Sequence, residues 1–185
     1  YIVSGGIEQF LLGAAIQPAQ ALDSCVADHL QNHLFMAPLD LLAINIARGR
    51  ELMIPTFNVV RDLLFLQPIA TFDELTGNST EGIALAANLT AVYGTSSTVG
   101  LDLFVGLVSE EHLPDKCMGE TLTVLLKAQF TRLRDCDPYY YQFGGLLDDY
   151  QLDFVANTGV KELFELVASI DMSVLFPGNP FLLTV

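Results

Sequence analysis

The sequence predicts a mostly α-helical chain, and three observations support this. Apolar residues at four-residue spacing indicate an amphipathic helix over residues 19–35; they are Leu22, Val26, Leu30 and Leu34. Pro38 precedes an apolar stretch that begins at Leu39, and proline is typical of a helix entrance. The run Thr71-Phe72-Asp73-Glu74 forms a capping box, which predicts the start of another short helix.

The other predicted helices follow from periodicity and from residues that end helices. Residues 57–65 continue as a helix that stops before Gln67-Pro68, because a residue before proline disfavours the helical conformation. Further helices are predicted over residues 81–93, 121–135, 146–156 and 160–168. The Asn157-Thr158-Gly159 run is a typical helix end.

Length and composition limit the possible classes of protein. A chain of 185 residues suffices for one domain with a core. It is 51% hydrophobic and 16% charged, yet its apolar runs are far shorter than the 18 or so residues of a membrane helix. A chain this apolar is expected to pack against more protein. Since it begins at Tyr1, we expect a fragment or a processed chain.

The charge balance is strongly acidic. The formal net charge is −14, from 22 acidic and 8 basic residues. This argues against a nucleic-acid-binding protein, which needs a basic surface. It fits the soluble surface of a secreted protein.

The stretch LDLLAINIARGRELMIPTFNVVR, residues 39–61, holds the main candidate site. At 3.6 residues per turn, Leu41, Asn45 and Arg48 fall on one face of its helix. An asparagine on an apolar face needs a hydrogen-bond partner, and a partly buried arginine needs an anion. Either the helix presents both groups to a polar ligand, or both bond neighbouring protein groups as ordinary structure.

The same stretch resembles the signature helix of the animal-type haem peroxidases, the peroxidase–cyclooxygenase superfamily that includes peroxidasins. That signature reads approximately D-L-x-A-L-N-x-Q-R-G-R-D-H-G-L-P-x-Y-N. The matching positions are Asp40, Leu41, Ala43, Asn45, Arg48, Gly49, Arg50, Pro55 and Asn58. The resemblance implies that Asn45 accepts the N–H of the proximal haem histidine and that Arg48 contacts a haem propionate. It also implies that Leu41 belongs to the cofactor-binding face.

Other blocks resemble the family in the same order. Residues 5–35 are similar to its G-G-I-D-P-x-L-R-G segment, and the tail VLFPGNPF is weakly similar to its closing segment. Matches in two later blocks are Tyr93, Gly94, Asp102, Val105, Gly106, Glu110, Gln129, Phe130, Leu133, Arg134, Asp135 and Asp137. The departures are Leu12, Glu51-Leu52-Met53, Phe104, Cys136 and Pro138.

This resemblance implies that residues 1–185 are the C-terminal, mostly α-helical part of a single haem peroxidase catalytic domain. It implies haem b whose iron ligand lies outside this chain, a calcium site upstream, and the remainder of the same domain as partner. No catalytic residue is assigned within the chain. The implied activity is an extracellular peroxidase that uses hydrogen peroxide to oxidise halide, phenolic or matrix donors, with a role in the response to oxidative stress. The alternative is a degenerate, haem-free fold with a structural or adhesive role.

Several other groups have both a functional and a structural interpretation. His29 and His33 have the i, i+4 spacing of metal ligands, but no third ligand is spaced to complete a site. Neither they nor His112 has the sequence context of the proximal haem ligand. Asp135 and Asp137 are expected in turn and capping roles rather than catalysis. The aromatic run of residues 139–141 is expected to pack beneath a loop rather than to carry a radical.

Cysteines and glycosylation sequons give the last predictions. Cys117 and Cys136 flank a helix of about 14 residues, so their α-carbons are expected roughly 20 Å apart, too far for a disulfide. With Cys25 the set is odd, so at least one thiol is free or pairs elsewhere. Asn78 lies in a loop sequon and is a candidate N-glycan site. Asn88 lies in a second sequon within a predicted helix, where use is less favoured.

Overall fold

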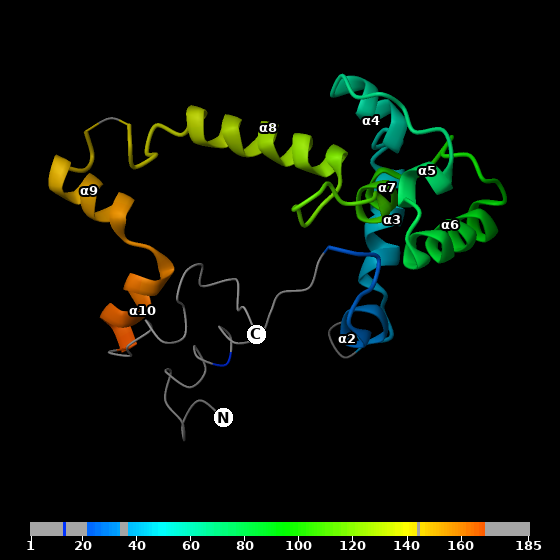
Figure 1. The fold of residues 1–185 in the computed structure, drawn as a ribbon, viewed down its shortest axis with the longest axis horizontal. Coiled ribbons are helices and arrows are strands. Elements are labelled where there is room, and N and C mark those ends of the chain that lie inside the picture. Colours follow the sequence, from blue (N-terminus) through cyan, green and yellow to red (C-terminus); the bar gives the residue numbers. More distant parts are fainter. Residues whose placement is uncertain (1–12, 14–21, 34–36, 144, 169–185) are drawn as a thin grey trace. The chain divides into compact units, whose positions relative to one another are not determined.

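We describe the fold from a computed structural model, in which residues 13, 22–33, 37–143 and 145–168 are described. These residues form helices and connecting loops (Figure 1). Two isolated β-bridges join Thr71 to Ser97 and His112 to Gly119. The helices are α2 (Asp28–Asn32), α3 (Leu41–Glu51), α4 (Phe57–Leu63), α5 (Phe72–Thr76), α6 (Thr80–Tyr93), α7 (Leu103–Ser109), α8 (Glu120–Cys136), α9 (Asp149–Asn157) and α10 (Val160–Ala168). The mostly helical prediction is confirmed.

The chain divides into two compact units. One comprises Ala21–Arg132 and is called the central unit here. The other comprises Tyr1–Gln20 together with Leu133–Val185, and its described helices are α9, α10 and the end of α8. The candidate site lies wholly in the central unit.

The core of the central unit lies where α4, α5, α6 and α7 meet. Its buried residues are Phe57, Ile69, Phe72, Leu75, Ala86, Leu89 and Leu101. Leu103, Val105 and Leu107 of α7 pack against this cluster from one side. Each fully buried Phe or Leu side chain contributes about 1.5–3 kcal/mol, so this cluster anchors the helices that carry the site.

Helix ends follow the local chemistry of the sequence. Asp40 caps α3, because its side chain accepts from the backbone N–H groups of Leu42 and Ala43 at 2.9 and 3.1 Å. Thr71 caps α5, as its capping box predicted, and accepts from the Glu74 N–H. α6 ends at Gly94, which takes the left-handed conformation with φ +70°.

Two predicted helices differ from the structure. The prediction of a helix over residues 19–35 is wrong for residues 22–27, which are not helical. Among the described residues of this range, the helix is α2 (Asp28–Asn32). The Asp23 side chain accepts from the Cys25 N–H at 2.8 Å, a local bond that competes with helix formation. The helix predicted to begin at residue 146 begins instead at Asp149, where Asp148 and Gln151 complete a reciprocal capping box.

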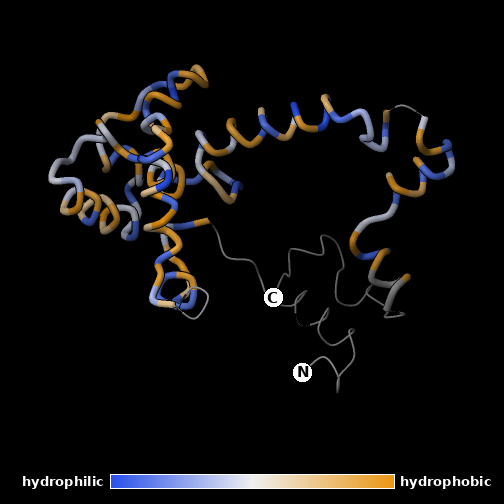
Figure 2. The backbone as a smooth tube through the Cα atoms, turned by 180° about the vertical axis from the view of Figure 1, so that it is seen from behind, coloured by the Kyte–Doolittle hydropathy of each residue, from blue (hydrophilic) through white to orange (hydrophobic). Residues whose placement is uncertain are grey.

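Other helices match prediction closely. The helix predicted over residues 57–65 ends at Leu63, and Phe65 takes a positive φ of 60°. The helices predicted over 81–93, 121–135 and 160–168 are α6, α8 and α10. Hydrophobic and hydrophilic residues alternate along α8 (Figure 2), and its later half is exposed. In the described part of the chain, no helix is long and apolar enough to span a bilayer.

Candidate functional site

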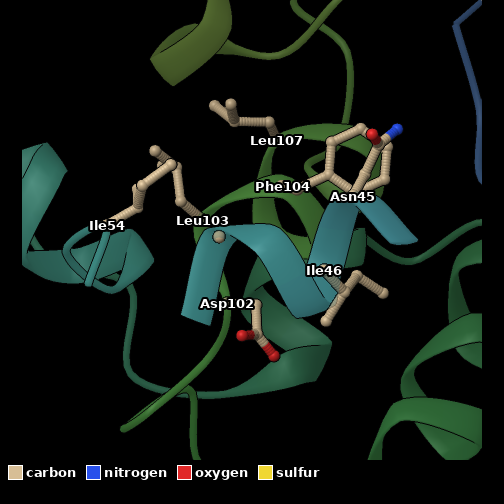
Figure 3. Close-up of a pocket in the computed structure, with 8 residues that line it drawn as sticks. Asn45, Ile46, Ile54, Asp102, Leu103, Phe104 and Leu107 are labelled. Carbon is tan, nitrogen blue, oxygen red and sulfur yellow. The ribbon is translucent and has the colours of Figure 1, made fainter. Parts of the chain in front are cut away.

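An apolar pocket of about 260 Å³ opens between α3 and α7 (Figure 3). Its lining residues are Asn45, Ile46, Gly49, Ile54, Asp102, Leu103, Phe104 and Leu107. The aliphatic and aromatic side chains form its walls, and Asn45 and Asp102 are its polar groups. The pocket can therefore receive an apolar group that carries a few polar atoms.

The signature-helix residues lie on α3 as predicted, but they are more exposed than expected. Asn45 and Arg48 are both exposed, whereas Leu41 is half-buried. Within the described residues, neither the Asn45 amide nor the Arg48 guanidinium makes a side-chain hydrogen bond or ion pair, so the alternative in which both bond neighbouring protein groups has no support there. The expectation of a partly buried Arg48 is wrong for this structure, where the Arg48 side chain is exposed although five other residues of α3 are partly buried.

The arginine of α3 that meets an anion is Arg50. Its Nε donates to Asp102 Oδ1 at 2.8 Å and its Nη2 to Oδ2 at 2.7 Å, a bidentate pair. The Tyr93 hydroxyl donates to the same Oδ2 at 2.7 Å. These bonds from Arg50, supported by Tyr93, hold the pKa of Asp102 below its usual value although partial burial opposes this. Burial and the bond to Asp102 raise the pKa of Tyr93.

A second pocket, of about 390 Å³, lies between α3 and α6. Its lining residues are Ile46, Arg50, Asn88, Leu89, Val92, Tyr93 and Val105. Ile46 lines both pockets, so the two pockets adjoin neighbouring faces of α3.

A buried ionic cluster supports α7 and α8. Arg61 Nη1 donates to Glu110 at 2.6 Å and to the Thr121 hydroxyl at 2.7 Å, and its Nη2 donates to Glu120 at 2.9 Å. Its Nε donates to the Gln67 carbonyl at 2.6 Å. Burial raises the pKa of Glu110, and the nearby Glu120 carboxylate adds to the rise, while Thr121 and Arg61 oppose it.

Sequence reasoning gave no role to these charged groups. Tyr93, Asp102 and Glu110 matched the family blocks, and Arg50 matched the signature, but a match does not say what a residue contacts. Arg61 carried no signal except its place at the end of an apolar helix, where a buried cation requires a partner.

The histidines do not converge on a metal site in the described residues. His29 and His33 are exposed, their ring centroids are 6.0 Å apart, and His33 lies 3.5 Å from the Asp28 carboxylate. No group of three metal-ligating side chains occurs among the residues that the structure describes. His112 instead bonds the Leu22 carbonyl through Nε2 at 2.6 Å.

The remaining candidates have structural surroundings. Asp135 accepts from Arg134 Nε, and Asp137 accepts from the Tyr139 N–H in a turn. Tyr140 packs against its neighbours, with ring centroids 4.9 Å from Tyr141 and 5.4 Å from Phe143. Cys25, Cys117 and Cys136 are exposed, and no disulfide joins them.

The sequons also have different settings. Asn78 is exposed in the turn between α5 and α6, directly before the Ser79 cap of α6. Asn88 is exposed but lies within α6 and lines the second pocket. Residues 1–12 and 14–21, which carry most of the first resembling block, and the tail after residue 168 lie outside the described residues.

Comparison with known proteins identifies related chains. The model of the family described as animal haem peroxidase matches residues 1–174. The human peroxidasin homolog is 34% identical over 165 residues, which cover 86% of this chain and 11% of that protein. The chain therefore spans about a tenth of the length of this relative.

Solved structures resemble the fold. Peroxidase A from Dictyostelium discoideum matches with a TM-score of 0.70 and 26% identity over 87% of this chain and 31% of its own. A fatty acid α-dioxygenase from Arabidopsis thaliana matches with a TM-score of 0.76 and 23% identity, over 94% of this chain and 28% of its own. The latter likeness concerns the fold alone.

Proposed function

Because this chain belongs to the animal haem peroxidase family, we propose that it forms the proximal-side wall of a haem pocket in a secreted peroxidase. In this proposal residues 1–185 are the C-terminal part of one catalytic domain. The remainder of the domain supplies the iron ligand, the distal residues and a calcium site. The enzyme uses hydrogen peroxide to oxidise halide, phenolic or matrix donors, and the cofactor is haem b.

The observation that carries the proposal is the pocket between α3 and α7. A porphyrin is a flat apolar ring with two carboxylates at one edge. The pocket offers apolar walls from Ile46, Leu103 and Phe104, with Asn45 at its lining. Arg48, three residues further along α3, is an exposed cation without a partner among the described residues. These residues fit one wall of a haem site.

Each residue has a defined task in this site. When bound, haem would supply the redox chemistry between peroxide and the donor. The Asn45 carbonyl oxygen accepts the N–H of the histidine supplied by the rest of the domain, which fixes the imidazole ring and raises its basicity. Arg48 pairs with a propionate carboxylate, and Leu41 extends the apolar contact.

Large exposed apolar side chains support the incorporation of this chain into a larger domain. Phe65 is 95% exposed and Val92 is 81% exposed in the central unit. In α9 and α10, Tyr150 and Leu166 are also largely exposed. A separate soluble chain rarely leaves so many such residues in water, so we infer that the remainder of the peroxidase domain covers them.

The first test is the visible absorption spectrum of the full-length protein from its native source, before and after addition of peroxide. A Soret band that shifts with peroxide supports the proposal. Absence of a Soret band, in protein of full-length mass, overturns it. That outcome favours a haem-free structural or adhesive module. The replacement of the family's D-H-G by Glu51-Leu52-Met53 agrees with such a module.

The second test addresses the two polar residues. Asn45→Ala should lower peroxidase turnover with little change in thermal stability, because the exposed amide makes no described hydrogen bond. Arg48→Gln should weaken haem retention. Arg132→Gln on α8, which changes an exposed arginine outside the pocket, is the matched control for Arg48→Gln. Unchanged turnover in Asn45→Ala, with haem still bound, removes Asn45 from the proposed role.

Secretion and glycosylation form a separate part of the proposal. Asn78 carries an N-linked glycan, since it is exposed in a turn, whereas Asn88 lies within α6 beside the second pocket and is the weaker site. Mass spectrometry of the secreted protein before and after glycosidase treatment tests both sites. An unmodified Asn78 in secreted material contradicts this assignment.

A further inference from the structure

α3 has few attachments in the central unit. None of its residues is buried, and Ile46 lines both pockets. Within the described residues, the side-chain hydrogen bonds that join α3 to any other element run only from Arg50 to Asp102. Asn45 lies five residues earlier, about 7.5 Å along the helix axis. Its place in the pocket therefore depends on how firmly this pair holds the helix.

Asp102 occupies an unusual position for such a bond. It is the N-cap residue of α7, where aspartate normally accepts from the backbone N–H groups of the first turn. Its side chain makes no capping bond. Both oxygens are directed instead to Arg50 of α3, and Oδ2 also accepts from Tyr93, the last residue of α6. The Asp102 carboxylate thus connects α3 and α6 to the start of α7 instead of capping α7.

We propose that Asp102 is a positioning residue, whose carboxylate, held by Arg50 and Tyr93, fixes α3 against α6 and α7 and thereby sets where Asn45 stands in the pocket. The carboxylate is only 15% exposed, so the bidentate bond is shielded from water on the Asp102 side. Phe104, two residues after Asp102, lines the same pocket as Asn45. The Asp102 carboxylate therefore sets the spacing between the two walls of this pocket, which are formed by α3 and α7. The link to Asn45 rests on the proposed function, whereas the holding of α3 does not.

Hydrogen–deuterium exchange of the full-length protein tests the holding of α3. In Asp102→Asn, which keeps one acceptor but loses the charge, amides of residues 41–51 should exchange about tenfold faster. Amides of α4 and α5 should be unchanged. Tyr93→Phe removes one of the three bonds and should have a smaller effect. Arg50→Met, which changes an exposed side chain, provides a second variant if Asp102→Asn folds poorly.

Asp135→Asn is the matched control. Asp135 also accepts from an adjacent arginine Nε at 2.8 Å, but that pair is exposed and joins no two helices. The Asp135→Asn variant should leave hydrogen–deuterium exchange in α3 unchanged. Unchanged α3 exchange in both Asp102→Asn and Arg50→Met overturns the proposal.

The midpoint potential of the haem iron tests whether Asp102 sets the position of Asn45. This potential should shift in Asp102→Asn but not in Asp135→Asn. Faster α3 exchange without a shift in potential overturns that link and leaves the holding role supported. If the wild-type protein carries no haem, the proposed function fails, while the exchange experiment still decides whether Asp102 holds α3.

Discussion

Arg61 and Glu110 form an ion pair at 2.6 Å in which both side chains are only 5% exposed. They lie 49 residues apart in the sequence, on α4 and at the end of α7. Thr121 at the start of α8 completes the cluster, since its backbone N–H and its hydroxyl both donate to Glu110 at 2.8 Å. This cluster joins α4, α7 and α8.

Removing one partner of this pair should destabilise the central unit strongly. Arg61→Met leaves Glu110 as a buried carboxylate without a cation, which typically costs about 3–5 kcal/mol. Thermal unfolding of the full-length protein measures the loss. Arg134→Met, which breaks an exposed Arg–Asp pair, is the control and should have little effect. Equal unfolding temperatures for the two variants would contradict the importance of the buried cluster.

The pH dependence of stability should show the titration of Glu110. Two carboxylates, Glu110 and Glu120, share the one guanidinium of Arg61, and burial raises the pKa of Glu110 in the folded state. The folded state therefore holds this proton more tightly than the unfolded state, so stability from this group falls as pH rises through the interval above 4.5. Unfolding of wild type and Glu110→Gln at several pH values across this interval measures it. The free energy of unfolding of the wild type, relative to that of Glu110→Gln, should fall with rising pH. A relative free energy of unfolding that rises with pH would contradict the prediction.

Gly106 is required by close helix packing. A Cβ atom at this position of α7 would overlap the ring of Phe57, which is fully buried. Gly106→Ala should therefore destabilise the protein by about 1–3 kcal/mol through overpacking. Calorimetry of the full-length protein should show a lower unfolding temperature for Gly106→Ala than for the wild type, and an unchanged or raised temperature would refute the packing argument.

Met53 carries backbone strain at the end of α3. Its φ is 53°, in the left-handed region, and it stands where the family signature has glycine. A non-glycine residue in this conformation costs about 1–2 kcal/mol. Met53 is 87% exposed, so little packing is lost when its side chain is removed. Met53→Gly should raise the unfolding temperature, and Met53→Ala, which retains a Cβ, should not. No gain in Met53→Gly would show that the strain is absent from the protein in solution.

The match of Asn58 to the family signature did not reveal what its side chain contacts. Only the structure shows the Asn58 amide donating to the Ile69 carbonyl and to Thr98, while its oxygen accepts from the Ile69 N–H at 3.0 Å. It holds the loop after α4 rather than a ligand.

The helical class, most helix positions and the family could be predicted from the residue pattern alone. Periodicity, caps and glycine or proline stops act over a few residues, so the Thr71 cap and the helix end at Asn157-Thr158-Gly159 could be predicted locally. The helix predicted at residues 22–27 is absent. There Asp23 accepts from the Cys25 N–H, and the Leu22 carbonyl accepts from His112, a contact 90 residues away in the sequence that no local pattern records.

The pairing of charged residues could not be predicted from the residue pattern. Arg48 and Arg50 are equivalent by composition and lie two residues apart, yet Arg50 reaches Asp102 while Arg48 remains exposed. Arg61 and Glu110 are brought together by the crossing of α4 and α7, a long-range relation that no local pattern records. Ion pairing depends on distances of a few ångströms between distant segments. The fold sets those distances, and the order of residues along the chain does not.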